Sequence, residues 1–127
     1  MSKKWISSGS DFEKLAGYSR AVIENGLVHV SGTTGFDYAT MLIQDDLAAQ
    51  THQTFKNIQA ALQQAGASLD DVVRVHYLIT DASYFSEVAP IFGQYFANAR
   101  PAATALVVGL VDPRMKIEIE VTARIPT

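Results

Sequence analysis

The sequence of 127 residues contains no cysteine. This excludes disulfides, a thiol nucleophile, and zinc or iron–sulfur centres held by thiolates. The sequence also lacks an apolar run close to the ~20 residues of a membrane-spanning helix, and its N-terminus carries two lysines without the apolar core of a signal peptide. We therefore expect a cytoplasmic protein that has no membrane partner.

An excess of positive charge is also absent. Ten basic against thirteen acidic residues give a net charge of −3, without a basic run or a charged tail. Charge alone therefore offers no surface for nucleic acid, and we expect no nucleic-acid partner. The length suits one domain over residues 1–127 with a single hydrophobic core.

Signals for a metal or a nucleotide cofactor are missing as well. His29, His52 and His76 lie far apart in the sequence, without the short spacings of metal ligands. Residues 31–35 read SGTTG, which resembles a phosphate-binding loop but lacks the Gly-Lys-Ser/Thr ending and the helix that should follow. We predict no metal and no cofactor, and keep open that His29 and His76, on adjacent strands, form an acid–base pair.

The first half of the chain predicts a β-hairpin followed by a helix. The apolar runs 21–23 and 27–33 flank Asn25-Gly26, a strong hairpin signal. After a loop over residues 35–44, Asp45 and Asp46 can cap a helix that Gly66 ends. One face of this helix carries apolar and small residues at spacings of three and four: Leu47, Thr51, Phe55, Ile58, Leu62 and Ala65.

The second half predicts a strand, a helix and two more strands. Residues 72–80 are rich in β-branched side chains and form the first strand. Pro90 lies inside the next helix, which predicts either a kink or a helix that begins near Glu87. The last strands span 103–109 and 116–124, with a turn at Asp112-Pro113. The helix is expected to bury Phe85, Val88, Phe92 and Tyr95 or Phe96.

This order of elements predicts an α+β sandwich, with two helices on one face of a mixed sheet. In the strand 116–124, apolar side chains alternate with charged ones, so its two faces differ in polarity. The uncovered face would include Leu27, Leu78 and Val107 or Val108 among its charges. A face of this kind commonly meets another subunit.

Several segments resemble one known family. Residues 98–123 read NARPAATALVVGLVDPRMKIEIEVTA, residues 17–22 read GYSRAV, and residues 30–32 read VSG. Together with the helix segment 49–58, they are similar to the signatures of the Rid family, also called YjgF or endoribonuclease L-PSP-like proteins. The resemblance covers almost the whole chain. It implies a chorismate-mutase-like fold and a homotrimer with a central β-barrel and clefts between subunits.

The resemblance also implies a site. Tyr18 and Ser31 would line the cleft, and Glu118 would orient water or shuttle a proton. Ala103 stands where active members carry the arginine that grips a substrate carboxylate, and alanine has no group for that task. Other departures are Ala89 in place of a common asparagine, Ala105 in place of a small polar residue or cysteine, and Thr33 in place of glutamine. The substrate-binding set is therefore Tyr18, Arg20, Ser31, Gly32, Thr33, Ala103, Thr104 and Ala105.

Two assignments keep alternatives. Arg20, Arg100 or Arg114 could replace the absent guanidinium, Arg20 being the best placed, or Arg20 could be an exposed surface arginine. Glu118 could act as acid or base with a pKa raised by burial beside Glu120. It could instead form only a salt bridge, to Arg74 or Lys116.

We therefore predict a hydrolase-like enzyme that hydrolyses, tautomerises or otherwise processes a small reactive metabolite of imine or enamine type. The substrate is not expected to be a simple 2-imino acid held at position 103. The alternative is a non-catalytic trimer that binds a metabolite or has a regulatory role. Ribonuclease or translation-inhibitor activity is disfavoured by the pI of about 5.5.

Overall fold

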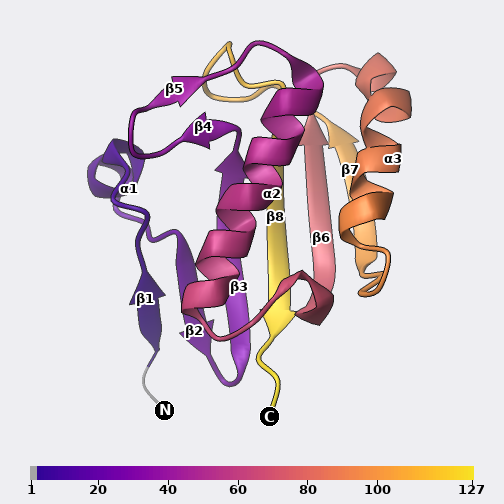
Figure 1. The fold of residues 1–127 in the computed structure, drawn as a ribbon. Helices are drawn as coiled ribbons and strands as arrows, with labels where there is room; N and C mark the ends of the chain where they lie inside the picture. The colour runs from indigo at the N-terminus through magenta and orange to yellow at the C-terminus, as the bar shows by residue number, and fades with distance from the viewer. Residues whose placement is uncertain (1–2) are drawn as a thin grey trace.

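The computed structural model describes residues 3–127. Its main sheet is mixed, with antiparallel pairing throughout except for the parallel pair β6 (Val72–Ile79) and β7 (Ala102–Val107). Figure 1 shows β8 (Ile117–Arg124) near the middle and β7 at one edge. The predicted α+β class with a mixed sheet is confirmed. The strand order is β1 (Lys4–Ile6), β2 (Ala21–Glu24), β3 (Leu27–Thr34), β8 (Ile117–Arg124), β6 (Val72–Ile79) and β7 (Ala102–Val107).

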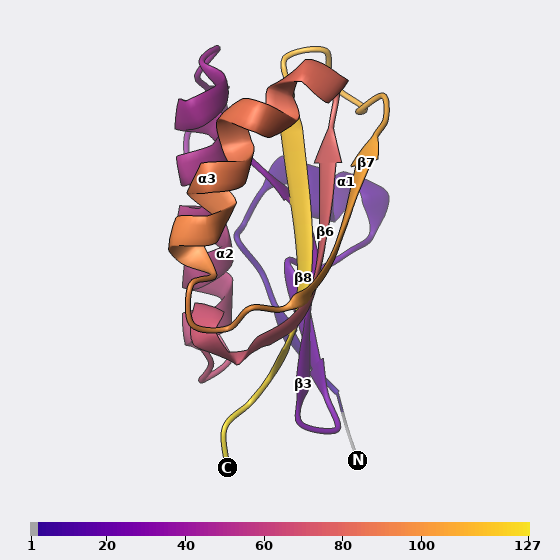
Figure 2. The same ribbon diagram turned by 90° about the vertical axis from the view of Figure 1, so that its right-hand side faces the viewer.

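Helices α2 (Leu47–Gln64) and α3 (Phe85–Tyr95) lie on the same side of this sheet, as Figure 2 shows. The hydrophobic core lies between them and the strands. Val28, Ile117 and Ile119 contribute from the sheet and meet Phe55 and Ile58 of α2, all fully buried. No helix within residues 3–127 is long and apolar enough to cross a membrane.

The predicted hairpin forms between β2 and β3. Asn25 and Gly26 have positive φ angles of 50° and 76°, as a two-residue turn between antiparallel strands requires. The helix predicted after Asp46 also forms, and the Asp46 carboxylate accepts a hydrogen bond from the Ala49 amide at 2.8 Å. Gly66, with φ of 82°, follows its end in the left-handed conformation.

Helix α3 differs in part from the prediction. It begins at Phe85, directly after a 3-10 turn over Ala82–Tyr84, and Pro90 lies inside it. Val88 and Phe92 are buried as predicted, and so is Phe96 beyond the helix end. The predicted burial of Phe85 is wrong, because its side chain is 46% exposed. The apolar face therefore begins one turn later.

Besides the 3-10 turns Leu69–Asp71 and Ala82–Tyr84, three short strands and one short α-helix were not predicted. They are β1, α1 (Asp11–Ala16), β4 (Phe36–Asp37) and β5 (Leu42–Ile43). The last two pair as a small hairpin inside the segment expected to be a loop. Each of these elements has six residues or fewer, too few for an apolar period to show in the sequence.

The edge strand β7 is exposed at every position. It spans Ala102–Val107, so it starts and ends earlier than predicted. Leu106 pairs with Leu78, on the face away from the helices, whereas Val107 pairs with the buried Ile79. Of the two residues expected on the uncovered face, Val107 is therefore wrong and Val108 lies beyond the end of β7; Leu106 occupies that face.

Candidate functional site

Glu118 lies on β8, between β3 and β6 (Figure 1). Its neighbours in sequence, Ile117 and Ile119, are fully buried toward the helices, so Glu118 projects from the opposite face. It is paired with Thr34 on one side and Leu78 on the other. This carboxylate is therefore half-buried in the middle of the uncovered face.

Gly32 packs directly against this carboxylate. A Cβ atom built on Gly32 would lie 2.5 Å from Glu118 Oε2 and 2.9 Å from its Cδ. The pairing of β3 with β8 shifts register between Val30 and Thr33, and Gly32 lies in this irregular stretch. Only glycine leaves the Glu118 carboxylate in its place.

The surroundings of Glu118 favour a proton-transfer role. Burial raises the pKa of Glu118, and the nearby charge of Glu120 raises it further, while the positive charge of Arg20 opposes the rise. The net direction is upward, as predicted. A carboxyl group whose pKa moves toward neutrality can take up and release a proton more readily near neutral pH.

The alternative of a structural salt bridge is wrong for Glu118. The Lys116 ammonium donates a hydrogen bond to the Asp45 carbonyl at 2.7 Å and lies 3.6 Å from the Asp45 carboxylate. Among residues 3–127, neither Lys116 nor Arg74 forms an ion pair with Glu118. The carboxylate has no cation in contact within the described chain.

Arg20 is buried beside this site and supports its backbone. Its guanidinium Nη1 donates to the carbonyl of Gly32 at 2.9 Å and to the hydroxyl of Thr33 at 3.0 Å. Its Nη2 lies 3.5 Å from the hydroxyl of Tyr18. The side chain is only 2% exposed, so the interpretation of Arg20 as a surface arginine is wrong.

A buried carboxylate not predicted from the sequence holds the other side of Arg20. Glu13 Oε2 lies 3.5 Å from Arg20 Nε and also accepts hydrogen bonds from the hydroxyls of Ser8 and Ser10. Burial raises the pKa of Glu13, but these bonds, a further one from Ser7 and the charge of Arg20 outweigh it and lower the pKa. The sequence contained the signal, because Ser10 and Glu13 form a capping-box pattern at the start of α1.

Tyr18 and Ser31 complete this part of the site. Tyr18 is 38% exposed; burial raises the pKa of its hydroxyl, which Arg20 partly opposes. The Ser31 hydroxyl donates to the Ser19 carbonyl at 2.6 Å, and the Ser31 amide donates to the Arg20 carbonyl at 2.9 Å. The structure thus joins Tyr18, Arg20, Ser31, Gly32, Thr33 and Glu118 in one region through these contacts.

The predicted residues of β7 lie elsewhere in the same chain. Ala103 and Ala105 pair with Val75 and Tyr77, which face the helices, while Thr104 pairs with His76 on the uncovered face. β6 separates this strand from β8. One chain therefore does not bring residues 103–105 to Glu118.

The other two candidate arginines differ from each other. Arg114 is committed to Asp112, with Nε to Oδ1 at 3.0 Å and Nη2 to Oδ2 at 2.8 Å. Arg100 forms no side-chain hydrogen bond or ion pair within residues 3–127 and lines an open cavity beside Ala103. Arg100, unlike Arg114, keeps its guanidinium available to a ligand.

The histidines do not form the acid–base pair considered above. β8 lies between the strands of His29 and His76, so these strands are not adjacent. His76 Nδ1 instead contacts Glu120 Oε1 at 2.6 Å. In the described part of the chain, no group of three or more histidine or acidic side chains is arranged to hold a metal ion.

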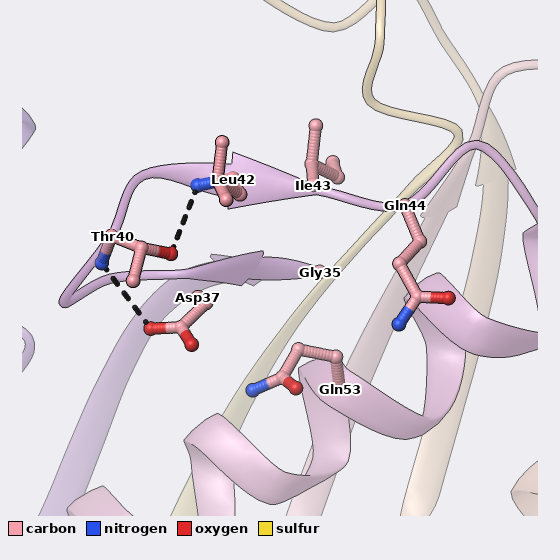
Figure 3. Close-up of a pocket in the computed structure, with 7 residues that line it drawn as sticks. All are labelled: Gly35, Asp37, Thr40, Leu42, Ile43, Gln44 and Gln53. Carbon is pink, nitrogen blue, oxygen red and sulfur yellow. Dashed lines mark hydrogen bonds between the residues drawn. The ribbon is translucent and has the colours of Figure 1, made fainter.

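A cavity of about 540 Å³ lies between the β4–β5 hairpin and α2. Figure 3 shows Asp37 and Gln53 facing this space, with Asp37 bonded to the backbone of Thr40 in the hairpin turn. Asp37 is its one ionisable side chain, and one of its oxygens caps this turn. Because Asp37 is exposed and already bonded to this turn, the cavity suits proton transfer less well than the half-buried Glu118.

A model of the family Endoribonuclease L-PSP matches residues 9–125. Two RutC family proteins are also similar to this chain. The one from Pyrococcus abyssi is 31% identical over 124 residues, covering 97% of this chain and 98% of the relative. The one from the leuC 5' region of Leuconostoc mesenteroides subsp. cremoris is 34% identical over 128 residues, with the same coverage of 97% and 98%.

Solved structures agree with these matches. Rv2704 of Mycobacterium tuberculosis, described as a member of the YjgF/YER057c/UK114 family, superposes with a TM-score of 0.88 at 44% identity, covering 97% of this chain and 99% of that one. RidA from the Antarctic bacterium Psychrobacter sp. PAMC 21119 superposes with a TM-score of 0.81 at 33% identity, covering 96% and 94%. Both fold and sequence are thus shared over nearly the full chain.

Proposed function

Because the chain belongs to the Endoribonuclease L-PSP family, which the Rid and YjgF proteins share, we propose that it processes a small reactive metabolite with an imine or enamine group. Hydrolysis of a C=N bond is the reaction that the site supports best. The observation that carries this proposal is Glu118: a half-buried carboxylate with a raised pKa, packed against a glycine and without an ion-pair partner among residues 3–127.

The proposed reaction adds water to the imine carbon. The Glu118 carboxylate takes one proton from water as the oxygen bonds to carbon, and returns it to the nitrogen, which gives a carbinolamine. The same carboxylate then takes the hydroxyl proton and passes it to the nitrogen as the C–N bond breaks. The products are a carbonyl compound and ammonia, so one carboxylate carries both protons of the water molecule.

Neighbouring residues would position this chemistry. Arg20 fixes the carbonyl of Gly32 and the hydroxyl of Thr33, and thereby the backbone against which Glu118 lies. Tyr18 is partly exposed, and Ser31 tethers β3 to Ser19, in the segment that precedes β2. In this proposal, Tyr18 contacts the ligand, and Arg20 is a positioning residue.

A homotrimer would complete the cleft. The edge strand β7 contains no charged residue and is exposed along its length, and such an edge tends to pair with or pack against another chain. Residues 103–105 are remote from Glu118 in one chain, so they can join its site only from a second copy. We propose that three copies place each β7 beside a neighbour's Glu118.

The substrate would differ from a simple 2-imino acid. Ala103 cannot hold a carboxylate, and an unpaired charge there would cost about 2 to 5 kcal/mol. A non-catalytic trimer that binds a metabolite is the second candidate, favoured if the ligand binds without turnover. The family's ribonuclease description is not proposed for this chain, because its net charge of −3 offers no basic surface for RNA.

The test is ammonia release from imines generated in solution by an L-amino-acid oxidase. We would compare 2-iminobutyrate with 2-imino-3-phenylpropionate, each against a blank without protein. The protein is expected to accelerate release from 2-imino-3-phenylpropionate more than from 2-iminobutyrate, the simple 2-imino acid, because alanine at position 103 leaves more apolar space for a bulky side chain. Glu118→Gln should lower the accelerated rate by about 100-fold or more, since general acid–base catalysis contributes ~10² to 10⁴.

Glu120→Gln is the matched control. This glutamate shares the face and the strand of Glu118 but is exposed and contacts His76. Its replacement should leave the rate at neutral pH within about threefold of the wild-type rate, because Glu120 makes only a smaller contribution than burial to the raised pKa of Glu118. Ligand binding without turnover of any imine would favour the non-catalytic candidate. Turnover at an unchanged rate in Glu118→Gln would contradict the catalytic role of Glu118.

A further inference from the structure

Arg20 lies near two carboxylates, Glu13 and Glu118, whose surroundings move their pKa values in opposite directions. Burial raises the pKa of Glu118, and the charge of Arg20 opposes this rise without cancelling it. Burial acts on Glu13 in the same sense, but hydrogen bonds from three serines and the charge of Arg20 lower its pKa. Two acids that share one cation and differ in this way can take different roles in acid–base chemistry. Glu13 stays ionised, and Glu118 is the group that exchanges protons.

The serines around Glu13 hold it in its charged form inside the protein. The residue is only 4% exposed. Ser7 donates a hydrogen bond to Oε1 at 3.0 Å, and Ser10 donates one to Oε2 at 3.0 Å. Ser8 donates from both its hydroxyl and its amide. Hydrogen bonds to a carboxylate favour ionisation, so a negative charge stays beside Arg20 over the pH range in which Glu118 titrates.

Glu13 acts on Arg20 through its charge and not through a hydrogen bond. Arg20 Nε lies 3.5 Å from Glu13 Oε2, and this nitrogen forms no hydrogen bond within residues 3–127. The guanidinium is fixed instead by its hydrogen bonds to Gly32 and Thr33. It also lies over the ring of Tyr38, with Cζ 4.6 Å from the ring centroid. Because these contacts do not involve Glu13, we expect the guanidinium to keep its place when the charge of Glu13 is removed.

The charge of Glu13 reaches the candidate site on the far side of Arg20. Burial raises the pKa of the Tyr18 hydroxyl, Arg20 lowers it, and Glu13 raises it again. Glu118 packs against Gly32, whose carbonyl Arg20 binds at 2.9 Å, so it lies within reach of the same two charges. Charges in a partly buried site interact over several ångströms, because the effective dielectric constant there is far below that of water.

Other titratable groups near Glu118 do not replace Glu13 in this role. Those on the uncovered face of β2, β3, β6 and β8, or directly before β8, are Glu24, His29, Arg74, His76, Lys116, Glu120 and Arg124. Of these, Glu120 raises the pKa of Glu118, less than burial does. Its side chain is 47% exposed, so water and salt screen its charge. Glu13 and Arg20 are the only charged residues among 3–127 that are buried.

We propose that Glu13 is a second functional carboxylate of this protein: its fixed negative charge offsets that of Arg20 and so sets the pH at which Glu118 exchanges protons. Glu13 is a positioning residue, because it acts through Arg20 and contacts no substrate. The inference rests on the proposed function for its link to catalysis. Without Glu13, the unopposed guanidinium favours the ionised form of Glu118, which then accepts a proton from water less readily.

The test is an NMR titration of the Glu118 side-chain carboxyl carbon, which needs no substrate. The signal that disappears in Glu118→Gln assigns this carbon. Glu13→Gln should raise the acid dissociation constant of Glu118 about threefold or more. The expected shift is smaller than the ~1 to 3 pKa units of charges in direct contact, because Glu13 lies behind Arg20.

Asp11→Asn is the matched control. It removes the same charge from the same short helix, but Asp11 is exposed, so the dissociation constant of Glu118 should not change. Arg20→Gln probes the pair from the other side. It leaves the charge of Glu13 unopposed and should lower the dissociation constant of Glu118 about threefold or more. The two variants shift the titration in opposite directions, so either one that folds tests the proposal.

Turnover tests the link to catalysis separately. In Glu13→Gln, the pH at which ammonia release falls in acid should move down together with the titration of Glu118. A shifted titration in a protein without imine turnover would sustain the action of Glu13 on Glu118 and overturn the proposed function. A titration of Glu118 that is unchanged in folded Glu13→Gln or Arg20→Gln would overturn the inference, whatever the turnover.

Discussion

Gly32→Ala should separate the proposed function from the stability of the fold. The added Cβ would lie 2.5 Å from Glu118 Oε2, whereas ordinary contacts begin at 3.4 Å. The carboxylate must therefore move by about 0.9 Å, the difference of these two values. A misplacement of ~1 Å can cost ~10²-fold in rate, so we expect turnover to fall about 100-fold, or ~2.7 kcal/mol in the barrier.

Stability should change little in this variant. The φ of Gly32 is not in the left-handed region, and the atoms that the new methyl meets belong to the movable end of a side chain. We expect the free energy of unfolding to stay within about 1 kcal/mol of the wild type. Chemical denaturation measures this, and ammonia release from 2-imino-3-phenylpropionate measures the turnover.

A matched glycine and a double variant complete the experiment. Gly109→Ala adds a methyl group with no heavy atom within 4 Å, so its turnover should equal that of the wild type. Glu118→Gln combined with Gly32→Ala should be no slower than Glu118→Gln alone, because both act through the same carboxylate. Full turnover in a folded Gly32→Ala protein would refute this reasoning.

Three further predictions concern stability and assembly. Because the pKa of Glu118 is raised in the folded state, ionisation of this side chain destabilises the fold as pH rises. Glu118→Gln should therefore unfold at a higher denaturant concentration than the wild type at pH 7. This difference in stability should vanish at acid pH, where Glu118 is protonated. The pKa of Glu13 is lowered instead, so its ionised form stabilises the fold above the ordinary glutamate pKa, and this stabilisation is lost as pH falls. Glu13→Gln should lower the free energy of unfolding by about 2 kcal/mol at pH 7, and the difference from the wild type should disappear in acid. Sedimentation of the wild type should give three times the 13.8 kDa chain mass. Leu106→Lys places a charge on the exposed edge strand and should give a smaller mass. An unchanged mass for this variant would argue against assembly through β7.

The elements with strong local signals could be predicted from the sequence. The turn at Asn25-Gly26 needs two positive φ angles, and few other dipeptides adopt them readily. The helix between Asp46 and Gly66 has a cap at each end and an apolar period over its whole length. The residues within and next to each element are thus enough to predict the turn and the helix.

The short and exposed elements were missed for a physical reason. The helix Asp11–Ala16 is stabilised by the contacts of Glu13 with serines and with the distant Arg20, which an apolar period does not reveal. The strand Ala102–Val107 is exposed on every residue, so no alternation marks which face each side chain takes. This is why Val107 was offered, as an alternative to Val108, for the face on which Leu106 lies.

The candidate site was predicted in part. The role of Glu118 was implied by the family resemblance, and its raised pKa followed from its expected burial beside Glu120. The contact with Gly32 did not, because it depends on a register shift in β3 and joins residues distant in the sequence. The burial of Arg20 likewise depends on Glu13, whose partnership no spacing rule predicts.

The central claim is that Glu118 transfers protons during imine hydrolysis. Its most direct test is the pH dependence of ammonia release from 2-imino-3-phenylpropionate, measured for the wild type and Glu118→Gln above the spontaneous rate. The account predicts a wild-type rate that falls in acid with an apparent pKa above the ordinary glutamate value of ~4.3, because burial raises the pKa of Glu118. The rate of the variant should show no such fall in acid. Equal rates for the two proteins across the pH range would contradict it.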